Sequence, residues 1–390
     1  RVVMKYRSFG SLPEKISALG FGCMRLPVID GKPEAIDESL AERMIKHGID
    51  QGINYVDTAY AYHGGMSEPF VGKVLKGDYR RKVNLATKMP VWLLQTEADF
   101  DRLLNEQLQR LQTDHIDFYL MHALSKVRWE NLKRLNMAAW AEKARADGRI
   151  GHLGFSFHDD YPVFKQIIDE YDGWDFCQIQ YNYVDTSEQA GTRGLDYAAS
   201  KGLAVVVMEP LLGGKLADPP TRVRAILDQA PLKRSPADWA LQWLWDQPKV
   251  SLVLSGMSTF EQVEENLASA AQSGTQQLTS ADKEMIELVG RTYHESTPVS
   301  CTRCRYCMPC PNGVNIPYIF DVFNKAAMFD MWPQMRFRYS QIVADANASA
   351  CIDCGACEDV CPQHLPISDW MPYIHEVLGQ EKAYDGRLVP

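Results

Sequence analysis

Eight short apolar segments recur along the first two thirds of the chain, and this recurrence limits the possible folds more than any other feature. They begin about every 26 to 47 residues and are rich in Val, Ile, Leu, Phe and Tyr. Their apolar character is nearly continuous, as expected of strands that are buried on both faces. In one-letter code they read ALGFGCMRL, INYVDTAY, VNLATK, IDFYLMH, IGHLGFS, FCQIQYN, LAVVVME and VSLVLSG.

Amphipathic helical stretches lie between these segments, and several end near a glycine, which suits a helix C-terminus. Eight strands alternating with eight helices predict an α/β fold, a closed (β/α)8 TIM barrel, over residues 1–285. An open doubly wound sheet is the competing fold. It would need a third glycine in a G-x-G-x-x-G turn after Gly20 and Gly22, and none stands in place. The clearest helical stretches are 37–52, 97–112, 129–148 and 260–272.

Length and charge narrow the remaining possibilities. The 390 residues leave room for a small second domain after such a barrel. The formal net charge of −9, without a basic stripe, argues against a nucleic-acid partner. The nearest approach to a membrane span, LAVVVMEPLL, is broken by Glu209 and Pro210 and is shorter than the roughly 18–20 residues a span requires. With no signal-peptide layout at the N-terminus, we expect a cytoplasmic protein with no membrane partner.

Eight of the ten cysteines are crowded into two motifs near the C-terminus. The first reads C-x2-C-x2-C-x2-C-P from Cys301, and the second reads C-x2-C-x2-C-x3-C-P from Cys351. Such crowding in a cytosolic chain indicates metal ligation more than disulfides. Zinc is a weaker alternative, because zinc sites use C-x2-C pairs separated by a longer spacer. Triplets with a trailing C-P are typical of iron–sulfur clusters.

Two 4Fe–4S clusters are therefore predicted in a mostly α-helical, ferredoxin-like domain over residues 286–390, since the segment between the motifs looks helical and aromatic. In two-cluster ferredoxins the fourth cysteine of each motif ligates the other cluster. The first motif is one residue shorter before its last cysteine than the usual bacterial run. Carried over, one cluster would use Cys301, Cys304, Cys307 and Cys361, and the other Cys351, Cys354, Cys357 and Cys310.

Four polar residues lie where catalytic groups of such a barrel belong, at the carboxyl ends of its strands. Asp57 ends the second strand, Tyr62 follows in its loop, Lys88 ends the third strand and His122 the fourth. The pKa of a tyrosine hydroxyl is near 10, and a neighbouring ammonium group lowers it. Such a group could protonate the alkoxide that forms when hydride adds to a carbonyl.

These residues and their surroundings resemble the aldo-keto reductases, because NYVDTAYAY, ATK and DFYLMH occur in the family's order. The resemblance covers about residues 5–275. It implies that Tyr62 is the general acid/base, that Lys88 and Asp57 tune it, and that His122 orients the substrate. The alternative is a buried Asp57–Lys88 ion pair beside an incidental histidine. In the C-terminal part, CRYCMPCPNGVNIP and CGACEDVCPQHLPI resemble a subfamily with an added ferredoxin domain.

The resemblance also implies a nicotinamide cofactor, NAD or NADP, held by Ser156 and Gln178, although Phe157 stands where the family usually has Asn. GMSTFEQVEENL resembles the loop that binds the adenosine phosphate, but it has no Lys or Arg for a 2′-phosphate. A flavin therefore stays open as an alternative cofactor, and Cys23 is also interpretable as simple core packing. The residues expected to contact the cofactor are Gly22, Cys23, Met24, Ser156, Gln178, Met208, Glu209, Pro210, Leu211, Gly213, Lys215, Gly256, Met257, Ser258, Gln262, Glu265 and Asn266.

Two redox modules in one chain leave three hypotheses, because hydride transfer moves two electrons and an iron–sulfur cluster passes one. In the first, the protein is a nicotinamide-dependent enzyme that reduces a small-molecule carbonyl or oxidises an alcohol, with the clusters transferring electrons. In the second, the clusters relay single electrons from a ferredoxin-type donor to a flavin or to the substrate. In the third, the barrel is a catalytically idle redox sensor, which the intact set of four polar residues disfavours.

Overall fold

The computed structural model describes residues 3–301, 306–361 and 363–387, which form two compact units. The first unit comprises Arg1–Ala217 with Arg234–Lys283. The second comprises Asp218–Lys233 with Glu284–Pro390. The segment from 218 to 233 leaves the first unit after its seventh barrel strand and returns to it. The two units are therefore connected at three places along the chain.

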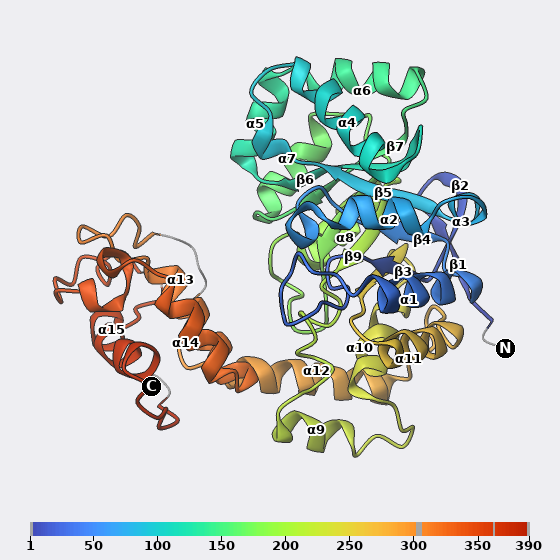
Figure 1. Ribbon diagram of the computed structural model, residues 1–390. Coiled ribbons are helices and arrows are strands. Elements are labelled where there is room, and N and C mark those ends of the chain that lie inside the picture. The colour runs from blue at the N-terminus through green and yellow to red at the C-terminus, as the bar shows by residue number, and fades with distance from the viewer. Residues whose placement is uncertain (1–2, 302–305, 362, 388–390) are drawn as a thin grey trace. The chain divides into compact units, whose positions relative to one another are not determined.

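Eight parallel strands form a closed barrel in the first unit, which confirms the predicted fold class (Figure 1). The barrel closes where the last strand pairs with the first, with Gly256 beside Gly22. The loops that follow these two strands are therefore neighbours, although they are more than two hundred residues apart in sequence. The barrel strands are β3 (Leu19–Gly22), β4 (Tyr55–Asp57), β5 (Asn84–Met89), β6 (Ile116–Leu124), β7 (Ile150–Phe157), β8 (Phe176–Gln180), β9 (Ala204–Met208) and β10 (Leu252–Gly256).

Helices surround the barrel strands and bury their apolar faces against them (Figure 1). The predicted helical stretch 129–148 is two helices rather than one. The break falls at Asn136, whose backbone φ of 57° is incompatible with a continuous right-handed helix. The helices of this unit are α1 (Glu38–Asp50), α2 (Ser67–Val74), α3 (Asp78–Lys82), α4 (Ala98–Leu111), α5 (Lys126–Arg134), α6 (Met137–Ala146), α7 (Tyr161–Asp169), α8 (Gly191–Ser200), α10 (Pro236–Trp245) and α11 (Phe260–Ala271).

An N-terminal hairpin of β1 (Tyr6–Phe9) and β2 (Leu12–Ser17) packs at the end of the barrel opposite the carboxyl ends of its strands. Phe9 is fully buried, and its ring centroid lies 5.0 Å from that of Phe118 inside the barrel. Gly10 permits this close approach, because a Cβ at that position would lie 2.4 Å from the backbone nitrogen of Ala204. With this end filled by side chains, the opposite end remains for chemistry.

The second unit is helical in its described residues and has its own apolar core, in which Phe323, Trp370 and Met371 are buried. Helix α12 (Ser280–Glu295) begins in the first unit and continues into the second. In the described part of the chain, no helix combines the length and apolar character that crossing a bilayer would demand. The other helices of the second unit are α9 (Thr221–Leu227), α13 (Ile316–Phe329), α14 (Trp332–Ser340) and α15 (Ile367–Ile374), the last extended by a π-helical turn (His375–Gly379).

Candidate active site and cysteine-rich unit

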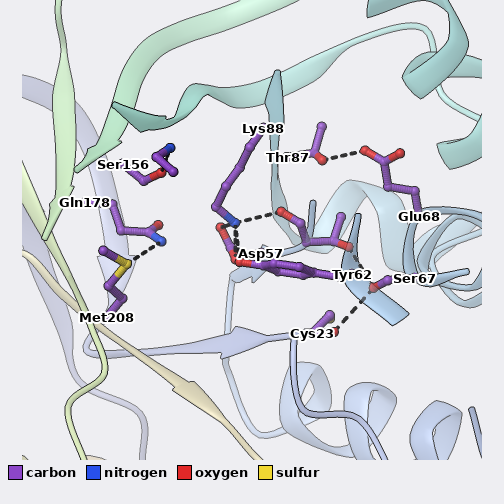
Figure 2. A network of polar contacts seen from close by, with 12 residues as sticks. Cys23, Asp57, Tyr62, Ser67, Glu68, Thr87, Lys88, Ser156, Gln178 and Met208 are labelled. Carbon is purple, nitrogen blue, oxygen red and sulfur yellow. Dashed lines mark hydrogen bonds and ion pairs between the residues drawn. The ribbon is translucent and has the colours of Figure 1, made fainter. Parts of the chain in front are cut away.

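Three of the four predicted catalytic side chains meet at the carboxyl end of the barrel (Figure 2). Asp57 is the last residue of β4, and Lys88 is the penultimate residue of β5. Tyr62 begins a short 3-10 turn (Tyr62–Gly65) five residues after Asp57. Because β4 and β5 are adjacent parallel strands, their ends place these side chains in one small volume.

The ammonium group of Lys88 is the centre of this arrangement. It donates to both carboxylate oxygens of Asp57, at 2.7 and 2.8 Å, and to the backbone carbonyl of Thr58, at 2.8 Å. The Tyr62 hydroxyl lies 3.2 Å from the same nitrogen. Lys88 is 0% and Asp57 1% exposed, so the ion pair is shielded from water. A buried charge pair of this kind requires the additional hydrogen bonds that the Thr58 carbonyl and Tyr62 provide.

Electrostatics keep Lys88 charged and Tyr62 protonated. Burial alone lowers the pKa of Lys88, but Asp57 and Tyr62 outweigh it, and the pKa ends above its ordinary value. Burial raises the pKa of Tyr62, and the positive charge of Lys88 offsets this only in part. The structure thus differs from the expectation of an unusually acidic phenol. Burial keeps water away from the phenolate and so destabilises it. This effect is larger than the stabilisation by Lys88, because Asp57 already neutralises the charge of Lys88.

His122 lies on β6 with its ring edge toward Tyr62, the ring centroids being 6.1 Å apart at an interplanar angle of 81°. Burial, together with the charge of Lys88, lowers the pKa of His122 well below its usual value, so the ring is neutral at pH 7. Its Nδ1 atom is buried and has no hydrogen-bond partner in the described chain. The ring of Trp92 also packs against His122, with centroids 5.2 Å apart.

A second layer of buried polar groups, which the sequence analysis did not identify, supports Lys88 from outside the barrel. Gln107 on α4 donates to the Lys88 backbone carbonyl, at 2.9 Å, and to the Glu68 carboxylate, at 2.6 Å. Glu68 on α2 also accepts from Thr87, at 2.7 Å (Figure 2). Both Glu68 and Gln107 are fully buried. A polar residue on an otherwise apolar helix face was the only signal in the sequence.

The residues expected at the nicotinamide divide into two groups. Gln178 on β8 faces the site, donates to the Met208 sulfur at 3.6 Å, and leaves its buried Oε1 without a partner in the described chain (Figure 2). An orphaned buried acceptor of this kind fits the amide of a nicotinamide. Ser156 instead accepts from the backbone N–H of Ala123 at 2.7 Å. Phe157 is fully buried against Phe164 of α7, with ring centroids 5.1 Å apart, so it does not occupy the position of an Asn facing the site.

The loops after β3, β9 and β10 meet at the rim through Arg25, which the sequence places at the end of the first barrel strand as a residue that could line the site. Its guanidinium lies 3.4 Å from the Glu209 carboxylate, and its side chain packs against Gly256. The Ser258 hydroxyl donates to the Arg25 carbonyl at 2.7 Å, and the Ser258 N–H donates to Gln262 at 2.7 Å. The expectation that a phosphate at this loop would find no Lys or Arg within the loop itself stays a prediction, but a cation from outside the loop, paired with Glu209, lies on a neighbouring loop. Barrel closure brings a distant arginine to this loop.

The other residues of the predicted cofactor set differ in their exposure. Cys23 is fully buried, and burial strongly raises the pKa of its thiol. Met257 and Asn266 are also buried, and Asn266 donates to Ser255 at 3.1 Å. Met24 is 52% exposed. The remaining residues of this set lie on the elements that surround this end of the barrel. They are the strand ends Gly22, Met208 and Gly256, the segment Pro210, Leu211, Gly213 and Lys215, and Glu265 in α11.

Four cysteines of the second unit line one small apolar cavity of about 20 Å³. They are the four that the sequence assigned to one cluster, Cys310, Cys351, Cys354 and Cys357. In the described residues no three metal-binding side chains converge as they would around a single ion. A 4Fe–4S cube takes one thiolate at each of its iron corners, so four cysteines that line one cavity suit a cluster of this type.

The ligands predicted for the other cluster are only partly described. Cys301, Cys307 and Cys361 are half-buried and pack against the core of the second unit. Cys304 lies outside the described residues. The two cysteines outside the motifs, Cys23 and Cys177, are buried in the barrel.

The fold and the site define a barrel oxidoreductase with a cysteine-rich module attached. The aldo/keto reductase family matches residues 18–287, and the chain belongs to this family. A 4Fe–4S dicluster domain matches residues 300–365. The chain thus has the architecture of the aldo-keto reductase subfamily with a C-terminal ferredoxin domain.

Several known proteins, two of them with solved structures, are similar to the barrel. L-galactose dehydrogenase from Arabidopsis thaliana is 27% identical over 288 residues, which cover 69% of this chain and 89% of the plant protein. The uncharacterized oxidoreductase YqkF from Bacillus subtilis is 25% identical over 300 residues, covering 68% and 91%. The holo form of aldo-keto reductase AKR11C1 from Bacillus halodurans superposes with a TM-score of 0.61 at 27% identity, covering 73% and 96%. An aldo-keto reductase from Klebsiella pneumoniae in complex with NADPH has a TM-score of 0.60 at 22% identity, covering 74% and 95%, and shares the fold.

Proposed function

We propose that this protein reduces a small-molecule carbonyl, or oxidises the corresponding alcohol, with NAD or NADP bound at the carboxyl end of the barrel. One observation carries the proposal: the buried Lys88 ammonium contacts both Asp57 and the Tyr62 hydroxyl. An Asp57–Lys88 ion pair with a purely structural role would not require a tyrosine hydroxyl as a further partner of the ammonium group. A tyrosine held there is available to exchange a proton with a substrate oxygen.

In the reductive direction, a bound nicotinamide would supply the hydride that the carbonyl carbon accepts. Tyr62 donates its hydroxyl proton to the carbonyl oxygen, and its raised pKa ensures that the proton is present at neutral pH. The phenolate left behind lies 3.2 Å from the Lys88 ammonium, which stabilises it. The neutral His122 ring, next to Tyr62, donates a hydrogen bond that fixes the carbonyl oxygen. In the oxidative direction the same groups act in reverse.

The proposed cofactor contacts follow from the unsatisfied and charged groups of the rim. Gln178 would bind the nicotinamide amide with its orphaned Oε1. Arg25 would be available to bind a cofactor phosphate, since its backbone carbonyl accepts from Ser258 and its side chain passes Gly256 at the start of that loop, although its guanidinium now pairs with Glu209. The Klebsiella pneumoniae relative is described in complex with NADPH, which supports a nicotinamide over a flavin.

We further propose that the second domain, residues 286–390, holds two 4Fe–4S clusters with the two crossed sets of cysteine ligands. The cavity lined by Cys310, Cys351, Cys354 and Cys357 supports one of these sets directly. Bound clusters would supply one-electron transfer. A relay from a ferredoxin-type donor to the barrel is the second candidate function, and the presence of a dicluster domain in the same chain favours it.

Anaerobic titration of the holoprotein with NADH, NADPH and FMN separates these two functions. We expect a nicotinamide to bind and to support turnover of an aldehyde without any iron–sulfur donor. If no nucleotide binds and only a reduced ferredoxin changes the visible absorbance of the clusters, the carbonyl reductase proposal is refuted and the relay is supported. Tight FMN binding without nicotinamide binding would refute it equally.

A further inference from the structure

A positively charged side chain at the mouth of the barrel has no carboxylate partner. Arg128 lies in the first turn of α5, six residues after His122. It is half-buried, and one of its N–H groups donates to the backbone carbonyl of Ala123 at 2.7 Å. Its guanidinium carbon lies 5.6 Å from the ring centroid of Trp92. Across the described ranges, no ion pair or further acceptor engages the remainder of its five N–H groups.

The charge of Arg128 reaches the reaction site. Burial lowers the pKa of His122, and the positive charge of Arg128 is among the groups that lower it further. His158, directly after β7, is exposed. Surrounding atoms nevertheless exclude enough water to lower its pKa, and Arg128 contributes to that shift. Arg128 is therefore one of several charges that act on both imidazoles.

The other charges around the mouth do not neutralise this cation. Asp57 is committed to Lys88, with both carboxylate oxygens hydrogen-bonded. Glu209 is engaged by Arg25 at 3.4 Å. Asp159 accepts from the backbone N–H of Lys126 at 2.8 Å and makes no described ion pair with Arg128, whose guanidinium lies next to Trp92, a residue that is 43% exposed. A half-buried guanidinium in such a position is a strong site for a planar anion.

We propose that the substrate is a carbonyl compound that also carries a carboxylate, which Arg128 binds while Trp92 covers the body of the molecule. A single guanidinium balances the single charge of a carboxylate and can hold it through two parallel N–H···O bonds. This proposal rests on the proposed carbonyl reduction at Tyr62 and specifies the substrate class of that same site. His122 contacts both Tyr62, where the carbonyl would react, and Trp92, which packs near Arg128.

A purely structural role for Arg128 makes a different prediction. The backbone of Ala123, directly after His122, has a φ of 54°, and its peptide groups are held by Ser156 and Arg128. If Arg128 only braced this turn, its loss would misplace His122 and slow every substrate equally. A binding role predicts a loss confined mainly to anionic substrates.

The test compares 4-carboxybenzaldehyde with its neutral counterpart, methyl 4-formylbenzoate, using the anaerobically purified holoprotein. We expect wild-type kcat/KM to be at least about tenfold higher for the acid than for the ester. Arg128→Gln keeps a donor for the Ala123 carbonyl but removes the charge. It should lower kcat/KM for the acid by about ten- to a hundredfold, mainly through KM, and bring the acid-to-ester ratio close to one. Arg128→Lys should restore part of the ratio.

The matched control is Arg134→Gln. Arg134 is on the same helix, is exposed, and donates from its side chain to Asn131. It should leave the acid-to-ester ratio unchanged. A wild-type ratio near one, or an Arg128→Gln variant that slows both substrates equally, would overturn the carboxylate site while leaving carbonyl reduction intact.

A binding measurement separates this inference from the proposed reaction. Calorimetric titration with 4-(hydroxymethyl)benzoate requires no turnover. We expect the wild-type protein to bind it about ten- to a hundredfold more tightly than Arg128→Gln does. If neither aldehyde is reduced but this difference in binding is found, the proposed reaction fails and the carboxylate site stands. Equal binding by both proteins refutes the carboxylate site.

Discussion

Replacing Lys88 by Met tests whether the site depends on its buried ion pair. The substitution removes three close hydrogen bonds, two to Asp57 and one to the Thr58 carbonyl, and the weaker contact with Tyr62. Asp57, at 1% exposure, is then left as an uncompensated buried charge. Such a charge is far more costly than the loss of an exposed ion pair, because water cannot reach it.

The size of the effect follows from this burial. Removing one partner of a buried ion pair costs about 3–5 kcal/mol of unfolding free energy. For a barrel of this size, that lowers Tm by about 6–20 °C. Combining Asp57→Asn with Lys88→Met removes both charges and should recover most of the loss, to within about 1–2 kcal/mol of wild type, because only the Thr58 carbonyl and a neutral amide lack partners.

The assay is thermal unfolding of the anaerobic holoproteins, followed by far-ultraviolet circular dichroism. Lys82→Met is the matched control. It breaks the Lys82–Asp50 ion pair, whose side chains are 49% and 47% exposed, and should cost at most about 1 kcal/mol. If Lys88→Met unfolds within the range of this control, or if the double variant is less stable than Lys88→Met, the buried pair does not have the role assigned to it.

Three further outcomes are expected. Tyr62→Phe should lower kcat for carbonyl reduction by about 10²–10⁴-fold and leave the visible absorbance of the clusters unchanged, whereas full activity would remove Tyr62 from the mechanism. The pKa of Tyr62 is raised and that of His122 lies well below its usual value, so neither group titrates near neutrality and reductive kcat/KM should be flat from about pH 6 to 9. Loss of activity in that window as pH falls would show that His122 becomes charged. Cys310→Ser should reduce the amount of bound iron by up to about half. The control Cys177→Ser, in the barrel, should leave the iron content unchanged. Equal iron content in both variants would exclude Cys310 as a ligand.

The sequence alone was enough to predict the barrel, the ferredoxin-like domain and the convergence of the charged groups near Tyr62. These features depend on local patterns. Apolar runs at regular spacing specify buried parallel strands, and the ends of adjacent parallel strands must lie together. The spacing of cysteines within each motif likewise specifies a type of cluster before any folding is considered.

Only the tertiary structure decided which distant side chains meet and how water is distributed around them. Barrel closure between β3 and β10 brings Arg25 to the loop containing Ser258, which no local pattern reveals. Burial reverses the expected direction of the Tyr62 pKa shift, because desolvation depends on every atom packed around the phenol. Arg128 is distinctive only because no carboxylate from elsewhere in the described fold reaches it. Strand periodicity is a property of neighbours along the chain, whereas solvation and charge compensation are sums over neighbours in space.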